Sequence, residues 1–417
     1  MVGRFRSYLR QYETHRELVG RARPSAVRAS GTAPDAIVVP ASRLAENLEH
    51  AIELARAADC QLVVLCSLEA RAAEVAGYCA ERNFTKAVLV DVPPGYQHEL
   101  VNFDTARRLL PESCTNPNGD LSAKRNLGLI LARMLGWKRI FFLDDDIREL
   151  RPADLRTTVS MLDRYRTAGM RVASFPDNSV VCHARRQTGD EQDVFVTGSV
   201  LAVNCAQPFS FFPDIYNEDW LFFYDDARNG SLGSSGCPAT QLAYDPFANP
   251  RRALHQEFGD LLAEGLYALL HKGAGLEHAT RAYWSEFIDT RWALLVDLKK
   301  RAEAAGNAEM TSALESAALS LLQIEPWMCE DYVRTWREDL ARWHQALPKV
   351  TRAGSIDAAL RKLGLQRARV GRRDQRRFRA GRTLAAQAAT FNLVLGVGTA
   401  PLRADSTRFG RRRREKV

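Results

Sequence analysis

Residues 120–146 constrain the fold more than any other stretch of the chain. From Leu127 onward, apolar residues recur at three- and four-residue spacing, which predicts an amphipathic helix that Gly136 ends. Residues 139–143, Arg-Ile-Phe-Phe-Leu, then form an apolar run that is too short for a helix. Such a run is typical of a strand buried on both faces of a parallel sheet. This strand leads directly into three consecutive aspartates, residues 144–146.

Asp144, Asp145 and Asp146 carry charges that repel one another and cannot be buried without partners. In open α/β sheets, ligands bind at the carboxyl ends of the strands, which is where these residues would lie. A hard divalent cation at this position would resolve the repulsion. The alternative is that the aspartates cap the next helix or lie in a solvated turn. The stretch alone leaves both interpretations open.

Short apolar runs alternate with helical patterns through the first half of the chain. Strands are predicted at 36–40, 61–66 and 86–91, with helices between them. This alternation with short links predicts an α/β fold with a doubly wound, mostly parallel sheet flanked by helices. Beyond the aspartates, the pattern predicts four further elements: a helix at 152–168, a strand at 171–175, a polar loop at 176–192 and a strand at 195–203.

The charge divides the chain into a body and a basic end. The 417 residues suffice for one large domain with an appendage. Residues 351–417 hold 18 Lys and Arg against 4 Asp and Glu, a net charge of +14, which leaves −6 for the first 350 residues. We therefore predict four parts: a basic flexible arm at 1–34, an α/β domain at 35–275, a helical appendage at 276–348 and a basic, partly disordered tail at 349–417.

Eight cysteines show no metal-type spacing, and Cys66 and Cys205 lie in or beside apolar runs that are typical of buried thiols. We therefore expect a reducing, cytoplasmic environment. No segment near the start resembles a signal peptide, and no apolar span reaches the roughly 20 residues that a membrane helix needs. The basic tail could bind a polyanion or an anionic membrane surface weakly, which leaves a membrane-peripheral location open. No specific nucleic-acid partner is expected.

A second informative stretch spans residues 211–223, where Glu218 and Asp219 lie between aromatic and aliphatic side chains. At the start of a helix these two carboxylates would face different directions. One could then point into a cleft while the other braces it. The alternative is a plain helix N-terminus, where acidic residues are favoured by the helix dipole and no chemistry is needed.

A helix carrying Lys124-Arg125-Asn126, a buried strand ending in Asp-x-Asp and a later Glu-Asp-Trp together resemble the GT-A glycosyltransferases, most closely their inverting branch. The resemblance implies a GT-A fold and the transfer of a sugar from a nucleoside-diphosphate sugar to an acceptor hydroxyl. It implies Mn²⁺ or Mg²⁺ as the cofactor. It also implies that Asp219 is the general base and that Glu218 supports it.

The same resemblance assigns the remaining site residues. Asp146 would hold the metal ion, with Asp144 and His255 as further ligands. The predicted nucleotide-sugar site is a larger set: Pro40, Ser42, Arg43, Asp91, Lys124, Arg125, Asn126, Asp144, Asp145 and Gly198. Cys66 and Ser67 stand where many relatives carry an acidic pair for the base, so the nucleotide stays open. Asp91 is a candidate substitute for that pair.

The sequence contains no glycine-rich phosphate-binding motif of the usual kinds: GxGxxG does not follow the first strand, and GxxxxGK[ST] does not occur. The main support for a dinucleotide-binding protein or a P-loop nucleotide-binding protein is therefore missing. Two alternatives to a glycosyltransferase stay open: a nucleotidyltransferase acting on a sugar phosphate, and a polyanion- or membrane-binding protein acting through its tail. Residues 228–236 are the most glycine-dense segment and are predicted to form a flexible loop near the site that could close on the donor.

Overall fold

The computed structural model describes these residues: 15–21, 32–107, 110–111, 114, 120–172, 179–190 and 196–370. The chain divides into two compact units, Met1–Val370 and Gly371–Val417, and every described residue belongs to the first. Most of the predicted basic tail therefore lies outside the described residues, as does most of the predicted arm.

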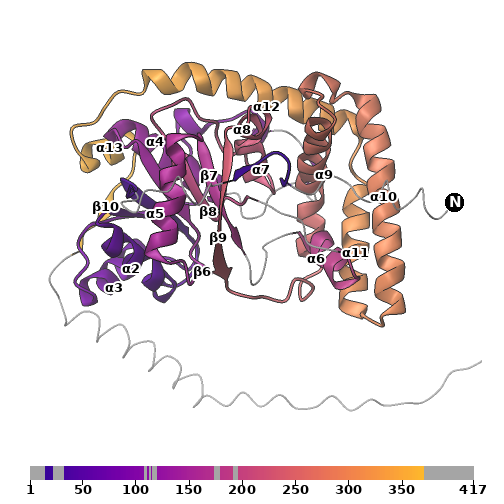
Figure 1. Ribbon diagram of the computed structural model, residues 1–417, viewed down its shortest axis with the longest axis horizontal. Coiled ribbons are helices and arrows are strands. Elements are labelled where there is room, and N and C mark those ends of the chain that lie inside the picture. The colour runs from indigo at the N-terminus through magenta and orange to yellow at the C-terminus, as the bar shows by residue number, and fades with distance from the viewer. Residues whose placement is uncertain are drawn as a thin grey trace, which may run out of the picture. The chain divides into compact units, whose positions relative to one another are not determined.

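A mostly parallel sheet forms the centre of the first unit, which confirms the predicted α/β class (Figure 1). Its strands run in the order β1-β9-β7-β8-β5-β2-β3-β4-β10, and β6 pairs with β9 beside this path. β8 is antiparallel to both of its neighbours, whereas β5, β2, β3 and β4 are parallel. The strand bounds are β1 Gly20–Arg21, β2 Ala36–Ala41, β3 Gln61–Cys66, β4 Ala87–Asp91, β5 Arg139–Leu143, β6 Ile147–Arg148, β7 Thr167–Val172, β8 Val200–Asn204, β9 Leu232–Gln241 and β10 Arg367–Ala368.

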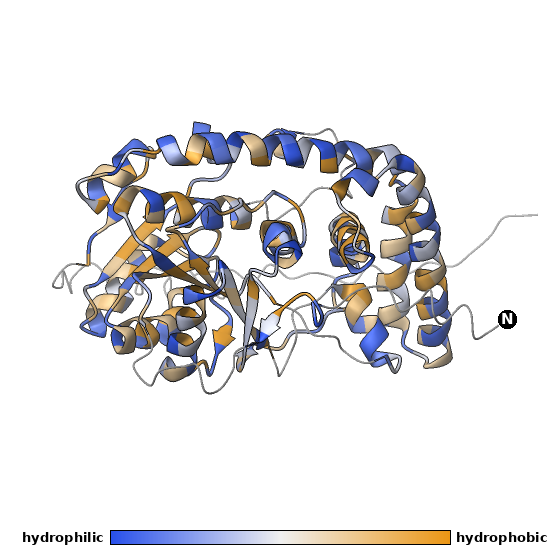
Figure 2. Cartoon of the chain, turned by 45° about the horizontal axis from the view of Figure 1, so that its top comes forward, coloured by the Kyte–Doolittle hydropathy of each residue, from blue (hydrophilic) through white to orange (hydrophobic). Residues whose placement is uncertain are grey.

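The central strands are apolar at almost every position because both faces of the sheet are buried. In β2, Val38 belongs to one hydrophobic core and Val39 to the other, and in β5 Phe142 and Phe141 divide in the same way. Figure 2 shows these strands as largely hydrophobic, in contrast to the mixed surfaces of the surrounding helices. Burial on two faces explains why these strands appear in the sequence as continuous apolar runs rather than alternating ones.

Helices cover the two faces of the sheet. α2 (Glu49–Ala58), α3 (Ala72–Glu81) and α5 (Pro152–Ser160) pack on one face, and α4 (Asp120–Leu135) packs on the other. Gly128 lets α4 approach β2 closely, because a Cβ atom there would lie 2.8 Å from Cγ1 of Val38. α4 ends where the sequence predicts, with Gly136 in the left-handed region at φ 79°.

Residues 251–346 are largely helical, as the sequence predicts. Its four long helices are α9 (Arg251–His271), α10 (Arg281–Ala304), α11 (Ala308–Leu321) and α12 (Pro326–Ala346). α12 runs back to the sheet, where α13 (Ile356–Lys362) and β10 follow, and β10 pairs antiparallel with β4 (Figure 1). Residues 356–368, which the sequence analysis places in the tail, thus belong to the folded unit. No helix within the described ranges is long and apolar enough to cross a membrane.

The structure differs from the prediction between residues 152 and 203. The helix predicted at 152–168 ends at Ser160. β7 begins at residue 167, inside that predicted helix, and overlaps the strand predicted at 171–175 at residues 171–172, whereas residues 173–175 lie outside the described residues. The predicted strand at 195–203 begins later, as β8 at Val200, and the predicted loop contains α6 (Val180–Gln187). β7 forms because β8 and β9 pair with it, and pairing with distant strands overrides a local helical pattern.

The prediction of a flexible, glycine-rich loop is wrong for residues 232–236, which begin β9. This strand pairs with β7, β1 and β6. Its small residues allow close packing, since a Cβ atom on Gly233 would lie 2.8 Å from the ring of Tyr165. The arm is also partly folded, because β1 pairs with β9 and His15 is fully buried.

Candidate active site

The Asp144–Asp146 segment lies at the carboxyl end of β5, beside the carboxyl end of its parallel neighbour β2. The carboxylate of Asp145 accepts hydrogen bonds from the backbone N–H groups of Ser42 (2.7 Å) and Arg43 (2.9 Å), and it also pairs with the Arg43 guanidinium. Asp145 is buried, so its charge is compensated by the turn that follows β2. The structure thereby brings Ser42 and Arg43 to the aspartate cluster.

Asp146 is held from two sides. Its Oδ2 accepts hydrogen bonds from Nη2 of Arg43 at 2.9 Å and from Nε2 of Gln241, at the end of β9, at 3.2 Å. Gln241 is not among the site residues that the sequence predicts. No local signal could have found it, because it lies 95 residues from Asp146 and next to a segment predicted to be a loop.

Arg125 joins the two acidic motifs. Its Nη2 lies 3.0 Å from both carboxylate oxygens of Asp144, and its Nη1 donates to Oε1 of Glu218. The guanidinium is almost completely buried. Burial alone would lower its pKa, but the surrounding carboxylates of Asp144, Glu218 and Asp219 raise that pKa above the ordinary value, so the charge is retained. The Arg125 side chain thus holds both Asp144 and Glu218, although these two residues are 74 positions apart in the sequence.

Asp219 is the second residue of α7 (Glu218–Phe222) and is half-buried. Its two carboxylate oxygens accept hydrogen bonds from the backbone N–H groups of Gly198 (2.7 Å) and Trp220 (2.9 Å). Burial raises the pKa of Asp219, although Arg125 opposes the shift, and burial raises the pKa of Glu218 in the same way. Asp219 therefore combines a fixed orientation with a proton affinity above that of an ordinary aspartate.

Gly198 lies directly against Arg125 and Asp219, so any larger residue there would displace a neighbouring side chain. A Cβ atom at this position would lie 2.6 Å from Nη1 of Arg125 and 3.0 Å from Cβ of Asp219. We expect Gly198→Ala to displace one of these side chains and to lower kcat by about tenfold to a hundredfold, because a shift near 1 Å is enough for such a loss. The measurement is steady-state turnover beside a thermal unfolding curve.

Gly354→Ala is the matched control, since a Cβ atom at Gly354 meets nothing within 4 Å and its backbone is not in the left-handed region. A Gly198→Ala protein with unchanged kcat would show that the close packing of Gly198 does not matter for the site.

Lys124 and Asn126, two other predicted site residues, form hydrogen bonds to neighbouring parts of the chain. The Lys124 ammonium, which is buried, donates to Ala41 O at 3.1 Å and to Oγ of Ser67 at 2.8 Å. Asn126 uses both ends of its amide on the backbone of Phe212, at 2.7 and 2.8 Å. These contacts join α4 to the chain at Ala41, Ser67 and Phe212.

Asp91 lies at the end of β4 and Pro40 lies near the end of β2, with β3 between these two strands. Asp91 accepts a hydrogen bond from the backbone N–H of Ala72, the first residue of α3, at 2.8 Å, which caps that helix. Pro40 is buried in β2, where it is opposite Leu65 in the register with β3. The contact of Asp91 is thus with α3, and that of Pro40 is with β3.

The proposed metal ligands are not assembled as a ready cluster. Within the described ranges, no group of three or more His, Cys, Asp and Glu side chains is arranged to hold a metal ion. His255 lies inside α9, which begins at Arg251, and its Nδ1 is buried without a hydrogen-bond partner. The sequence motif therefore does not translate into a set of three converging ligands.

The chemistry of the site nevertheless suits a hard cation. The five carboxylates of the two motifs outnumber the two guanidiniums that neutralise them, and carboxylate oxygens are the ligands that Mg²⁺ and Mn²⁺ accept. Asp146 could bind a cation once Arg43 releases it. The side chain of Arg43 is 45% exposed and has room to move.

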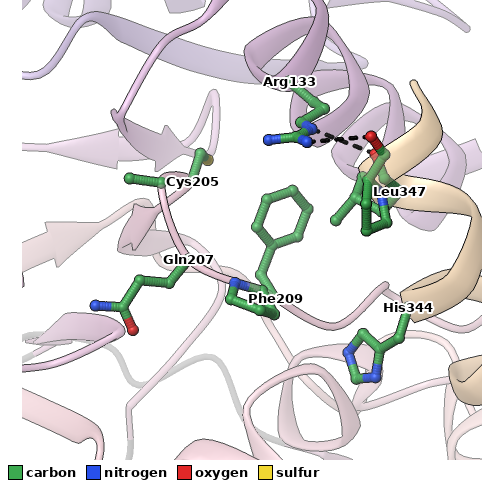
Figure 3. A pocket seen from close by; sticks show the side chains of 9 residues that line it. Arg133, Cys205, Gln207, Phe209, His344 and Leu347 are labelled. Carbon is green, nitrogen blue, oxygen red and sulfur yellow. Dashed lines mark hydrogen bonds between the residues drawn. The ribbon is translucent and has the colours of Figure 1, made fainter. Parts of the chain in front are cut away.

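A separate hollow of about 450 Å³ lies near the start of β5, at the end of the strand away from Asp144 (Figure 3). It is lined by Phe209, by Arg133 of α4 and by His344 of α12. The Nε of Arg133 donates a hydrogen bond to Leu347 O at 3.3 Å. Cys205, which follows β8, closes one side. Since β8 ends where β5 begins, this hollow is remote from Asp144, and none of the predicted site residues lines it.

Comparison with known proteins gives structural similarity only. No family model matches the chain, and no curated protein matches its sequence. Mannosyl-3-phosphoglycerate synthase from Rubrobacter xylanophilus aligns at 12% identity and a TM-score of 0.33, covering 64% of this chain and 84% of that one. The mannosyltransferase PcManGT from Pyrobaculum calidifontis, solved in complex with GDP-Man and Mn²⁺, aligns at 14% identity and a TM-score of 0.39, covering 81% of this chain and 92% of that one.

Proposed function

We propose that this protein is a glycosyltransferase of the GT-A type that moves a sugar from a nucleoside-diphosphate sugar to an acceptor hydroxyl. One observation carries the proposal: Arg125 bridges Asp144 and Glu218 and thereby joins the aspartate turn and the Glu-Asp helix in one site at the carboxyl edge of the sheet. This edge is where open α/β sheets bind nucleotides and sugars.

Asp219 is the proposed general base. The N–H groups of Gly198 and Trp220 hold its carboxylate in one orientation, and its raised pKa brings its proton affinity closer to what base catalysis near neutral pH requires. It would take the proton from the acceptor hydroxyl as that oxygen attacks the anomeric carbon. Attack from the face opposite the leaving group would invert the anomeric centre.

The donor would lie along the aspartate turn. Arg43 provides an exposed positive charge at the end of β2, and Arg125 holds Asp144 in place. A divalent cation, Mn²⁺ or Mg²⁺, would be held by Asp146 with Asp144 and would supply positive charge for the departing diphosphate. Gly198 and Ser42 complete the proposed donor site.

Calorimetric titration with a panel of nucleoside-diphosphate sugars tests the proposal. We expect one donor to bind more tightly with Mn²⁺ or Mg²⁺ than without, and Asp146→Asn to remove this cation dependence while the protein stays folded. Asp163→Asn is the control, because Asp163 pairs with Arg139 at the other end of β5. The release of nucleoside diphosphate in the presence of acceptor mixtures would identify turnover.

Each alternative has its own outcome in the same experiments. Turnover of a nucleoside triphosphate with a sugar phosphate would favour a nucleotidyltransferase. Loss of all binding on removing residues 371–417 would favour a protein that acts through its tail. If no nucleotide sugar binds with either cation present, the glycosyltransferase proposal fails.

A further inference from the structure

A buried charged cluster connects the C-terminal helices to each other, outside the site described above. Arg291 of α10 is fully buried and contacts three carboxylates of α9. Its Nε and Nη2 donate to Glu257 at 2.7 and 3.0 Å, Nη2 also donates to Asp260 at 3.0 Å, and Nη1 lies 2.9 Å from both oxygens of Glu264. The three acids are spaced by three and four residues, which places them on one face of the helix.

The cluster carries more negative than positive charge. One guanidinium faces three carboxylates, and burial raises the pKa values of Glu257 and Glu264. Arg185 of α6 adds positive charge near Glu264. Buried ionic clusters rarely stabilise a fold more than well-packed apolar side chains would. A function in positioning other groups would explain the cluster better than stability does.

Asp260 links this cluster to the proposed general base. While its Oδ2 accepts from Arg291, its Oδ1 accepts from Nδ2 of Asn217 at 2.8 Å. Asn217 directly precedes Glu218 and Asp219, and its backbone is in the left-handed region at φ 62°. The side chain of Asn217 is thus fixed at the point where the chain turns into α7.

α9 holds α7 at two further points. A Cβ atom on Gly259 would lie 2.1 Å from Tyr216 O, so the helix backbone rests directly against the residue before Asn217. About two turns further along α9, the Tyr267 hydroxyl donates to Trp220 O at 3.1 Å. α9 lies between α7 and α10 (Figure 1), and its Asp260 contacts both Arg291 of α10 and Asn217, which precedes α7.

We infer that Arg291, Asp260 and Asn217 are positioning residues, through which the C-terminal helical appendage fixes the orientation of Asp219 in the active site. The inference rests on the proposed function for its catalytic consequence, but not for its structural one. The chain of contacts runs from Arg291 through Asp260 to Asn217, and each link is a hydrogen bond between buried or half-buried groups.

Asn217→Gly is the most direct test, because glycine adopts the left-handed backbone without strain and only the side-chain link is lost. Arg291→Lys is the second variant, since lysine keeps the charge but cannot reach three carboxylates at once. Tyr283→Phe is the matched control: its hydroxyl also joins α10 to α9, at Gly265 O and 2.6 Å, but through a different residue of α9 from Asp260.

Hydrogen–deuterium exchange of residues 216–223 provides a readout that does not depend on activity. We expect faster exchange of this segment in Asn217→Gly and Arg291→Lys, and wild-type exchange in Tyr283→Phe. With an active donor, kcat should fall about tenfold to a hundredfold in the first two variants while KM for the donor stays within about twofold, because the base is displaced and the donor site is not.

Wild-type exchange of residues 216–223 in Asn217→Gly would overturn the inference whether or not a donor has been found. Faster exchange without any turnover in the wild-type protein would support the link and refute the glycosyltransferase proposal instead. If Arg291→Lys fails to fold, Asn217→Gly still decides. Faster exchange in Tyr283→Phe as well would show general loosening of the appendage and would also overturn the specific link.

Discussion

Asp219→Asn is expected to lower kcat for sugar transfer by about 10²- to 10⁴-fold, the range typical of a lost general base, while the protein stays folded. The amide cannot take up the proton of the acceptor hydroxyl. It can still accept one of the two backbone hydrogen bonds that now come from Gly198 and Trp220. The loss of the second bond should cost about 1 kcal/mol of unfolding free energy. Stopped-assay kinetics and chemical denaturation together separate the two effects.

The wild-type pH profile gives an independent check on Asp219. The base must be deprotonated, and burial raises its pKa above the ordinary value of 3.8. We therefore expect kcat/KM to fall on the acid side at a pH above that value. Asp226→Asn is the control. Asp226 belongs to α8 (Tyr224–Arg228) and is buried, where it pairs with Arg166 and accepts a hydrogen bond from Thr167. The substitution should therefore affect stability alone. Full activity in Asp219→Asn would refute the assignment of the base.

Arg125→Met is expected to cause the largest loss of stability, about 3 to 5 kcal/mol, which is typical when one partner of a buried ion pair is removed. The carboxylates of Asp144 and Glu218 would lose their shared partner, and Asp219 would lose the positive charge beside it. Methionine fills much of the same volume, so the loss would report charge rather than a cavity. Chemical denaturation at neutral pH is the measurement.

A second substitution identifies the origin of that loss. In the Arg125→Met background, Glu218→Gln removes one of the stranded carboxylates, and the double variant should be more stable than Arg125→Met alone. In the wild-type background the same change should destabilise, because Arg125 would lose a charged partner. If Arg125→Met unfolds within about 1 kcal/mol of the wild-type protein, the bridge between the two motifs does not hold the site together.

The sequence predicts the sheet well where strands are buried on two faces. β2, β3 and β5 fall within a residue or two of their predicted bounds, because burial on both faces requires apolar residues at every position. β9 is missed, and β7 is predicted only over its last two residues, for the opposite reason. Their sequences, Thr-Ala-Gly-Met-Arg-Val and a glycine- and serine-rich run, have little strand character, and they form strands because neighbouring strands pair with them.

Local periodicity and residue type are enough to predict the α/β class, the helix-strand-aspartate unit at residues 120–146 and the acidic pair at 218–219. Which charges meet depends on the three-dimensional arrangement: Arg43 pairs with Asp145 and Asp146, Gln241 contacts Asp146, and Arg125 joins Asp144 to Glu218. Residues far apart in the chain become neighbours through the order of strands in the sheet. That order depends on the packing of the whole domain, which no local pattern records.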